Sequence, residues 1–430
     1  MKSTRTEKDS LGPVKVPQDA YFGAQTSRAL KNFQISNRHI DRIFMESLGM
    51  IKLSAAKTNF QLRLLNSQQY RAIRTAAKEF INGNFSSDFI LDAYQAGAGT
   101  SYNMNANEII ANRANEILRF PESTKGNYKF VHPNDHVNMG QSTNDVIPTV
   151  SRLAILFSLP ALLNAIKSLE NRLADLAKKH KNLVKVGRTH LQDAVPITFG
   201  GEIDSFRAAL ENSRRFIEEQ STKLQIIGIG GTAVGTGLNA HPRYRQLMLK
   251  NLTKLTGIHF TSARNLTESA NNMNPFMNFS ASLRSLATDL LNLSANLKLM
   301  NSGPISGLGE ITLPPVQPGS SIMPGKVNPS ILECLEMICL QVLGYDKVIE
   351  MACQRSNFEL NTNCPLIIHN LLEAIKILTN GINMTTSLAI KNLKVNEKKI
   401  RETFENSLCT ATELAPRLGY QLTAEIVKSA

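Results

Sequence analysis

Hydroxyl, amide and cationic side chains gather in five polar, glycine-rich segments of this 430-residue chain. The segments span residues 95–108, 132–149, 187–196, 228–242 and 317–329. Their hydrogen-bonding side chains include Thr100, Ser101, Ser142, Thr143, Asn144, Thr189, His190, Lys326 and Asn328. Hydroxyls and amides donate hydrogen bonds to anionic oxygen atoms, and a lysine adds a positive charge. The set is therefore suited to binding carboxylates.

The segment 317–329 is the most informative of the five. Glycine and proline punctuate it from Gly319 to Pro329, which predicts a loop with an unusual backbone. Ser320 and Ser321 offer adjacent hydroxyls, and consecutive backbone N–H groups in such a loop can bind an anion. A loop of this kind could close over a substrate and bring a base to it. From composition alone, an ordinary turn is the commoner explanation.

The chain lacks the motifs of nucleotide sites. Gly228-x-Gly230 is not followed by the third glycine of a dinucleotide fingerprint, and no G-x-x-x-x-G-K-[ST] phosphate-binding loop occurs. The five cysteines form no C-x-x-C pair, and they are Cys334, Cys339, Cys353, Cys364 and Cys409. Their odd number fits poorly with a closed set of disulfides, so we expect reduced thiols. We expect neither a metal site nor a cofactor.

The net charge of +13, from 48 basic and 35 acidic residues, leaves two explanations open. It could attract small anions, or it could be a solvated lysine-rich surface. Binding of nucleic acid is disfavoured because the basic residues are scattered and the chain has no tryptophan. No apolar run approaches the roughly 20 residues that span a bilayer, and the N-terminus resembles no targeting signal. We therefore expect a cytoplasmic protein without a membrane partner.

Apolar residues recur at steps of three and four along three long stretches, which predicts helices with one apolar face. They are Leu162, Ile166, Leu169, Leu173 and Leu176, then Phe276, Phe279, Leu283, Leu286, Leu290, Leu293 and Leu297, and finally Ile368, Leu371, Ile375, Leu378 and Ile382. Several such helices indicate a long bundle. Stripes of this length favour an oligomer, although all of them could pack within one chain.

The length and pattern of the chain favour a division into three domains. Residues 1–138 are mixed in pattern and predict a mostly helical N-terminal domain. Residues 139–392 predict a central domain of long helices that carries the loop 317–329. Residues 393–430 predict a short helical C-terminal domain.

The run from Gly319 to Asn328 resembles the signature loop of the fumarase/aspartase superfamily, G-S-S-x-x-P-x-K-x-N. The other polar segments resemble those of the superfamily and follow in the same order. The resemblance extends from Glu7 to the region of Gly419. On these motifs the chain is identified as a member of the superfamily. The resemblance implies an all-α, three-domain fold with a central long-helix bundle, assembled as a homotetramer whose active sites are shared between subunits.

The resemblance also implies roles for individual residues. Ser320 is the expected general base, which would ionise with help from loop N–H groups and Lys326 and remove a proton from C3 of a small dicarboxylate. The carbanion would spread its charge into the adjacent carboxylate as an aci-carboxylate, so donors must fit this intermediate. The positions expected to bind the substrate are Thr100, Ser101, Ser142, Thr143, Asn144, Thr189, Ser321, Ile322, Met323 and Asn328.

His190 matches the active-site histidine of the superfamily. We expect it to bind a carboxylate, with a proton relay as the weaker alternative. Glu333 matches the acidic partner of this histidine, and such a pair can orient the ring.

Members of the superfamily differ in their leaving group. Four segments near the expected substrate favour the aspartase branch, and they are residues 97–101, 142–144, 193–196 and 317–318. Residues 306–310, 358–361 and 367–370 favour the fumarase branch. Because the pocket chooses the leaving group, we expect an aspartate ammonia-lyase, with class II fumarate hydratase as the alternative.

Two positions depart from the pattern of the superfamily. Ile305 stands where an arginine is usual, and Gly201 stands where a glutamine is usual. Such departures leave a third reading open, a structural paralogue without activity. The joint presence of Ser320, Lys326 and His190 argues for an enzyme.

Overall fold

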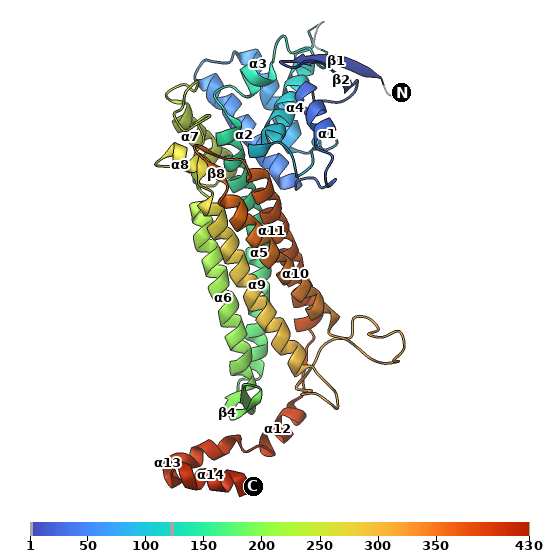
Figure 1. The fold of residues 1–430 in the computed structure, drawn as a ribbon, viewed down its shortest axis with the longest axis vertical. Helices are drawn as coiled ribbons and strands as arrows, with labels where there is room; N and C mark the ends of the chain where they lie inside the picture. Colours follow the sequence, from blue (N-terminus) through green and yellow to red (C-terminus); the bar gives the residue numbers. More distant parts are fainter. Residues whose placement is uncertain (1–2, 121–123, 430) are drawn as a thin grey trace. The chain divides into compact units, whose positions relative to one another are not determined.

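The computed structural model of the chain describes residues 3–120 and 124–429, and most of them are helical (Figure 1). The helical class expected from the sequence is therefore confirmed. The α-helices are α1 (Ala24–Asn32), α2 (Arg42–Gln61), α3 (Ser67–Ile81), α4 (Thr100–Leu118), α5 (Thr143–Lys179), α6 (Phe199–Lys223), α7 (Tyr244–Thr256), α8 (Leu266–Asn271), α9 (Asn274–Met300), α10 (Ser330–Cys353), α11 (Cys364–Thr385), α12 (Glu397–Glu405), α13 (Ala415–Leu418) and α14 (Tyr420–Ser429). Short helical turns are η1 (Gly97–Gly99), η2 (Pro133–Val137), η3 (Thr386–Ile390) and η4 (Cys409–Leu414).

Short two-stranded ribbons, which the sequence analysis did not predict, accompany the helices. The antiparallel pairs are β1 (Thr4–Asp9) with β2 (Gly12–Pro17), β3 (Val184–Thr189) with β4 (Gln192–Thr198), β7 (Ile311–Thr312) with β10 (Lys394–Val395), and β8 (Ser356–Asn357) with β9 (Leu360–Asn361). One pair is parallel, β5 (Ile226–Ile227) with β6 (Thr261–Ser262). Segment 187–196 therefore forms most of a hairpin.

The three apolar stripes lie on long helices, as predicted. The stripe from Leu162 to Leu173 is buried on α5, and only its last member, Leu176, is half-buried. The stripe from Phe276 to Leu297 is buried along α9, and the third stripe is buried along α11 and continues to Ile382. Burial of one face along each helix is the main source of its stability, because isolated helices are marginal in water.

The chain divides into two compact units. The first comprises Met1–Pro160, Glu218–Ala281 and Gly344–Ile375, and the second comprises Ala161–Ile217, Ser282–Leu343 and Lys376–Ala430. The division into three domains stays a prediction.

In the first unit α2, α3, α4 and α7 pack together. The rings of Phe44 and Phe89 both contact Tyr102, with centroid distances of 5.2 and 5.6 Å. Tyr102 is fully buried. This aromatic cluster fixes α4 against α2, and α4 is the helix that begins at Thr100.

The N-terminus of α1 is capped by Glu108 of α4. The carboxylate of Glu108 accepts from the backbone N–H of Gly23 and of Gln25, both at 2.8 Å, and from the hydroxyl of Thr26 at 2.6 Å. It thereby satisfies N–H groups that a helix leaves unpaired at its start.

In the second unit hydrogen bonds and ion pairs join neighbouring long helices. Arg214 of α6 donates to Glu170 of α5 at 2.8 Å. Ser213 of α6 donates to Asp289 of α9 at 2.5 Å. Ser294 of α9 donates to the carbonyl of Leu332 in α10 at 3.0 Å. The sequence-predicted bundle therefore extends through this unit.

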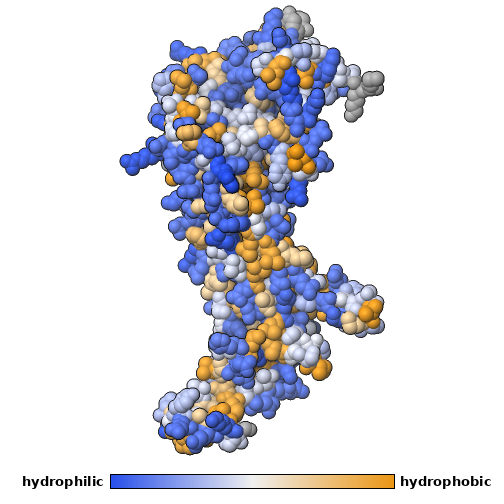
Figure 2. Space-filling view, in the orientation of Figure 1, coloured by the Kyte–Doolittle hydropathy of each residue, from blue (hydrophilic) through white to orange (hydrophobic). Residues whose placement is uncertain are grey.

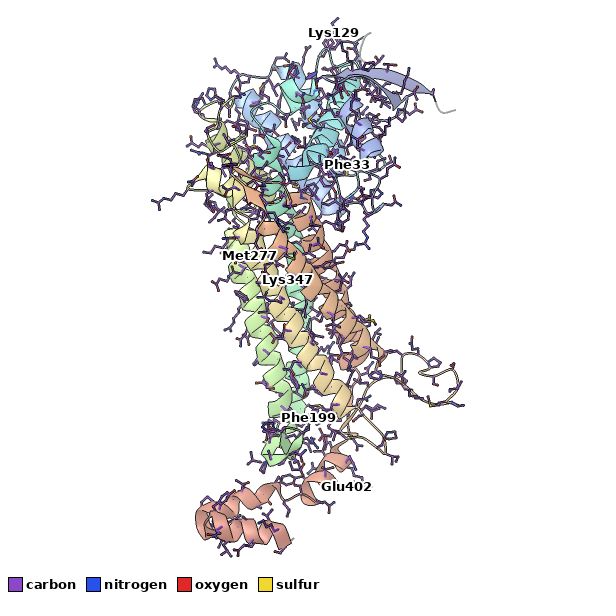
Figure 3. The ribbon with its side chains drawn as sticks, in the orientation of Figure 1. Phe33, Lys129, Phe199, Met277, Lys347 and Glu402 are labelled. Carbon is purple, nitrogen blue, oxygen red and sulfur yellow. The ribbon has the colours of Figure 1, made fainter. Side chains whose placement is uncertain are left out.

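The β3–β4 hairpin ends where α6 begins, at the buried Phe199, which is labelled in Figure 3. The ring of His180, just after α5, packs edge-on against Phe199 with a centroid distance of 5.7 Å. The Nζ of Lys185 in β3 lies 6.0 Å from the centroid of the same ring. The hairpin is thus fixed to the ends of two long helices.

One described helix, α5, is long and apolar enough to cross a membrane by length and composition alone. Inside the protein 72% of its most apolar stretch is buried. A core helix gives the same signal, so the helix is explained by the interior that it builds.

Candidate functional site

A cavity of about 400 Å³ opens in the first unit beside the start of α5. Its lining includes Ser142 and Thr143 of the sequence-predicted site. The other lining residues are Asn103, Met104, Asn138, Gly140, Gln141, Thr232, Ala233, Val234, Thr236, Leu238 and Asn239. Hydroxyls and amides therefore face one space, as expected for a site that binds a small anion.

Asp145 holds the two segments of the cavity wall together. Its carboxylate accepts from the backbone N–H of Ser142 at 3.0 Å, of Gly230 at 2.9 Å and of Thr232 at 3.0 Å. Asn144 adds a second link by donating to the carbonyl of Ala233 at 2.8 Å. Burial raises the pKa of Asp145 to about 6, while its N–H donors oppose the shift.

Thr100 is exposed at the first position of α4, and Ser101 beside it is buried. The turn before them requires a left-handed backbone, with φ of 60° at Ala98 and 82° at Gly99. A Cβ on Gly99 would lie 3.1 Å from a methyl carbon of Ile147 in α5. The glycine therefore lets the start of α4 approach α5 closely.

Sequence reasoning missed Lys52, which lies behind this cavity. Its Nζ donates to Asn103 at 2.7 Å, to Asn138 at 3.0 Å and to Gln141 at 2.9 Å, and each acceptor lines the cavity. The side chain of Lys52 is fully buried in α2. The available signal was a lone lysine within an apolar helical stretch, because a buried lysine is rare and needs partners.

In the second unit Thr189 and His190 lie at the tip of the β3–β4 hairpin, and both are exposed. Thr189 pairs with Gln192, so His190 and Leu191 form a two-residue turn. Both turn residues have positive φ, 56° and 59°. Such turns favour Asn-Gly, and a His-Leu pair carries backbone strain there. Strain of this kind is typical of functional positions.

The signature loop is tied at its base. The backbone N–H of Gly319 donates to the carbonyl of Lys326 at 2.8 Å, and the amide of Asn328 donates to the carbonyl of Gly319 at the same distance. A Cβ on Gly319 would lie 2.6 Å from the backbone of Lys326, so this position requires glycine. Ser321, Ile322 and Lys326 are exposed beyond the tie.

Inside the loop two backbone N–H groups point at the hydroxyl oxygen of Ser320. Ile322 N–H donates at 3.2 Å and Met323 N–H donates at 3.0 Å. Donors at this position stabilise negative charge on the oxygen, which lowers the free-energy cost of ionising the serine. The local geometry is therefore compatible with a serine base.

Glu333 lies exposed in the first turn of α10. Among the described residues no hydrogen bond or ion pair joins it to His190, so their pairing stays a prediction. Ile305 is 94% exposed in the segment after α9. A Cβ on Gly201 would meet only the hydroxyl of Thr198, at 3.1 Å. Neither departure from the superfamily pattern disturbs the described hydrogen bonds of the loop or the cavity.

Residues 12–344 match the sequence profile of the Lyase_1 family, described as lyase. The chain therefore belongs to this lyase family, which is the fumarase/aspartase superfamily. It is 41% identical over 429 residues to class II fumarate hydratase 2 of Bradyrhizobium diazoefficiens, covering 100% of this chain and 90% of the relative. It is also 41% identical over 426 residues to an aspartate ammonia-lyase of a Bacillus species, covering 99% and 90%.

Among solved structures the fold is similar to recombinant class II fumarase from Schistosoma mansoni. The TM-score is 0.96 at 37% identity, over 99% of this chain and 92% of that one. Most of the similar relatives are named class II fumarate hydratase.

The prediction of aspartase activity is wrong, because the names of these relatives favour the fumarase branch. The physical reason lies in the weight given to Thr143 and Gln317. Threonine and serine both offer a hydroxyl, and the Thr143 hydroxyl oxygen already accepts from Asn103 at 3.2 Å. Gln317 is exposed outside the tied part of the loop. Neither residue shows a contact that could select ammonia over water.

Proposed function

We propose that the chain is a class II fumarate hydratase, which interconverts L-malate with fumarate and water. The names of its relatives support the fumarase branch. The observation that carries the chemistry is the pair of N–H groups of Ile322 and Met323 on the Ser320 oxygen. They favour the alkoxide that a serine base requires.

In the direction of fumarate the Ser320 alkoxide takes the proton from C3 of L-malate. The electron pair left on C3 spreads into the neighbouring carboxylate and then forms the C2–C3 double bond as the C2–O bond breaks. The leaving hydroxide takes a proton from solvent and departs as water. Ser320 then returns its proton to solvent, so atoms and charge balance.

The carboxylates of the substrate require donors that strengthen as charge develops. We assign this role to the sequence-predicted binding residues, with Lys326 supplying a positive charge and His190 binding a carboxylate. The hydroxyls of Ser142 and Thr143 face the cavity in the first unit, which supports their part in this set.

We also propose that the chain assembles as a homotetramer with shared sites. An apolar stripe is exposed on α10, where Met337 is 64%, Leu340 59% and Met351 50% exposed. Gly344 continues the stripe and has open space where a side chain would be. A band of hydrophobic residues is visible along the long helices in Figure 2. Exposed apolar patches of this kind are typical of subunit interfaces.

The test is the formation of fumarate, followed by its ultraviolet absorbance, from L-malate and from L-aspartate. We expect turnover of L-malate and none of L-aspartate. Turnover of neither substrate, by protein that is folded and assembled, would contradict the proposal.

A further inference from the structure

Lys52 is a fully buried amine whose described hydrogen bonds all end on neutral amide oxygens. The three acceptors, Asn103, Asn138 and Gln141, match the three N–H donors of an ammonium group. Burial of an amine costs free energy, because burial disfavours its charged form. Such a residue is therefore a candidate for a functional role. Burial lowers the pKa of Lys52 to about 7, and the charge of Asp145 opposes this shift.

The three amides stand between Lys52 and the cavity that Ser142 and Thr143 line. Asn103 makes the connection, since its oxygen accepts from Lys52 at 2.7 Å and its nitrogen donates to the hydroxyl oxygen of Thr143 at 3.2 Å. The ammonium fixes which end of the amide faces Thr143. Because the Thr143 oxygen accepts from Asn103, its own O–H remains to donate elsewhere.

We propose that Lys52 is a positioning residue of the dicarboxylate site: through Asn103 it directs the Thr143 hydroxyl toward a substrate carboxylate, and its charge raises the affinity of the cavity for anions. The inference rests on the proposed function only in taking a dicarboxylate as the ligand. A hydrogen bond from a charged or oriented donor in a buried site is stronger than one in water. The buried charge is also poorly screened by salt.

The experiment measures binding of succinate, a four-carbon dicarboxylate without a reacting bond, by calorimetry on the full assembled chain. Lys52→Met removes the charge at similar volume, and Lys57→Met on the same helix is the matched control. We expect Lys52→Met to weaken binding about 10- to 100-fold and Lys57→Met to leave it unchanged. Thermal melts establish that both variants are folded.

Two further variants separate positioning from general support of the fold. Thr143→Val removes the end of the relay, so the double variant with Lys52→Met should bind no more weakly than the weaker single variant. Asn103→Asp keeps an acceptor for Lys52 and stays isosteric, but it loses the N–H that Thr143 receives, and its carboxylate offsets the charge of Lys52, so both parts of the proposed role are lost. It should weaken succinate binding to a similar degree even if Lys52→Met does not fold.

The pH dependence of succinate affinity tests the role of Lys52 in the wild-type chain. Lys52 is faced by the carboxylate of Asp145 from α5, and the Tyr244 phenol of α7 lies near that carboxylate. Succinate should bind more weakly above pH 7, as Lys52 loses its proton. This loss of affinity should be absent in Lys52→Met and should move to higher pH in Asn103→Asp, whose carboxylate stabilises the ammonium. Burial keeps the pKa of Tyr244 well above 10, so the phenol does not titrate there.

Equal succinate affinity, within twofold, in wild type, Lys52→Met and Asn103→Asp would overturn the inference. Additive effects of Lys52→Met and Thr143→Val would overturn the relay. Succinate binding without malate turnover would overturn the proposed function alone. A wild-type chain that binds no succinate would overturn the dicarboxylate site and, with it, the role of Lys52.

Discussion

The Nζ of Lys185 and the Oε2 of Glu310 lie 2.5 Å apart, and both side chains are buried. The other oxygen of Glu310 accepts from Arg188 at 2.7 Å. Lys185 and Arg188 belong to β3, the strand that leads to His190 at the hairpin tip, while Glu310 directly precedes β7, the strand that leads into the signature loop. The two segments of the second unit that carry predicted site residues thus share one anchor.

Glu310→Gln should destabilise the protein by about 1–3 kcal/mol, because Arg188 loses its carboxylate partner while Lys185 keeps only Glu202, which lies 2.5 Å from its Nζ. Arg188→Met should cost less, since Glu310 keeps Lys185. Chemical denaturation measures both free energies of unfolding. The control is Lys347→Met, at an exposed ion pair with Glu350 on α10 and labelled in Figure 3, where a change below about 1 kcal/mol is expected. If Glu310→Gln lowers the free energy of unfolding no more than the control does, Glu310 does not stabilise the contact between the two segments.

Ser320→Ala should lower kcat for L-malate by about 10²–10⁴-fold, the range that positioned acid–base groups contribute. Assembly and thermal stability should not change, because the Ser320 hydroxyl bonds only to N–H groups of its own loop in the described structure. Steady-state kinetics and light scattering check the two expectations. Near-normal turnover by the variant would show that another group is the base.

The stability of the protein should depend on the protonation of Glu108. Burial raises its pKa from 4.5 to about 7, against the opposing effect of its hydrogen bonds to Gly23, Gln25 and Thr26. A raised pKa in the folded state means that the contribution of Glu108 to stability is fully present below about pH 4.5 and is lost as the pH rises through about 7. Relative to Glu108→Gln, which does not titrate, the wild type should lose up to about 3 kcal/mol over this interval. Urea unfolding of both proteins at several pH values measures the difference, and a constant difference would refute the shift.

The exposed stripe on α10 should drive assembly. Met337→Glu combined with Leu340→Glu places charges on the stripe, so we expect smaller assemblies by light scattering and loss of malate turnover, because shared sites would come apart. Leu64→Glu, at a residue that is 44% exposed and does not belong to the stripe, is the control and should keep the native assembly. Full assembly of the double variant would place the interface elsewhere.

The long helices could be predicted because apolar residues recur along them at steps of three and four. The stripes from Leu162, Phe276 and Ile368 all proved to be buried faces of long helices. The β3–β4 hairpin could not be recognised from its polar tip, because the pairs Val184 with Thr198 and Lys185 with Ile197 lie outside the segment considered.

The candidate site was predictable only in part. Gly319 and Pro329 marked the signature loop correctly as irregular backbone. The cavity wall depends on Asp145 and Lys52, whose partners come from distant parts of the chain. The leaving group could not be predicted, because threonine at position 143 presents the same hydroxyl as serine would. The residue type therefore does not distinguish loss of ammonia from loss of water.

The tie at Gly319 has a mechanical consequence. The strands of chain on either side of residues 320–325 are fastened to each other by two hydrogen bonds at 2.8 Å. The tie therefore opposes lengthening or unravelling of the segment, so a displacement of the loop would come from rotation in residues 313–318 and around Pro329. Ser320 and the two N–H groups that face it would travel together as a rigid flap. As the proposed base, Ser320 would then reach the substrate with the two N–H groups that stabilise its negative charge already in place.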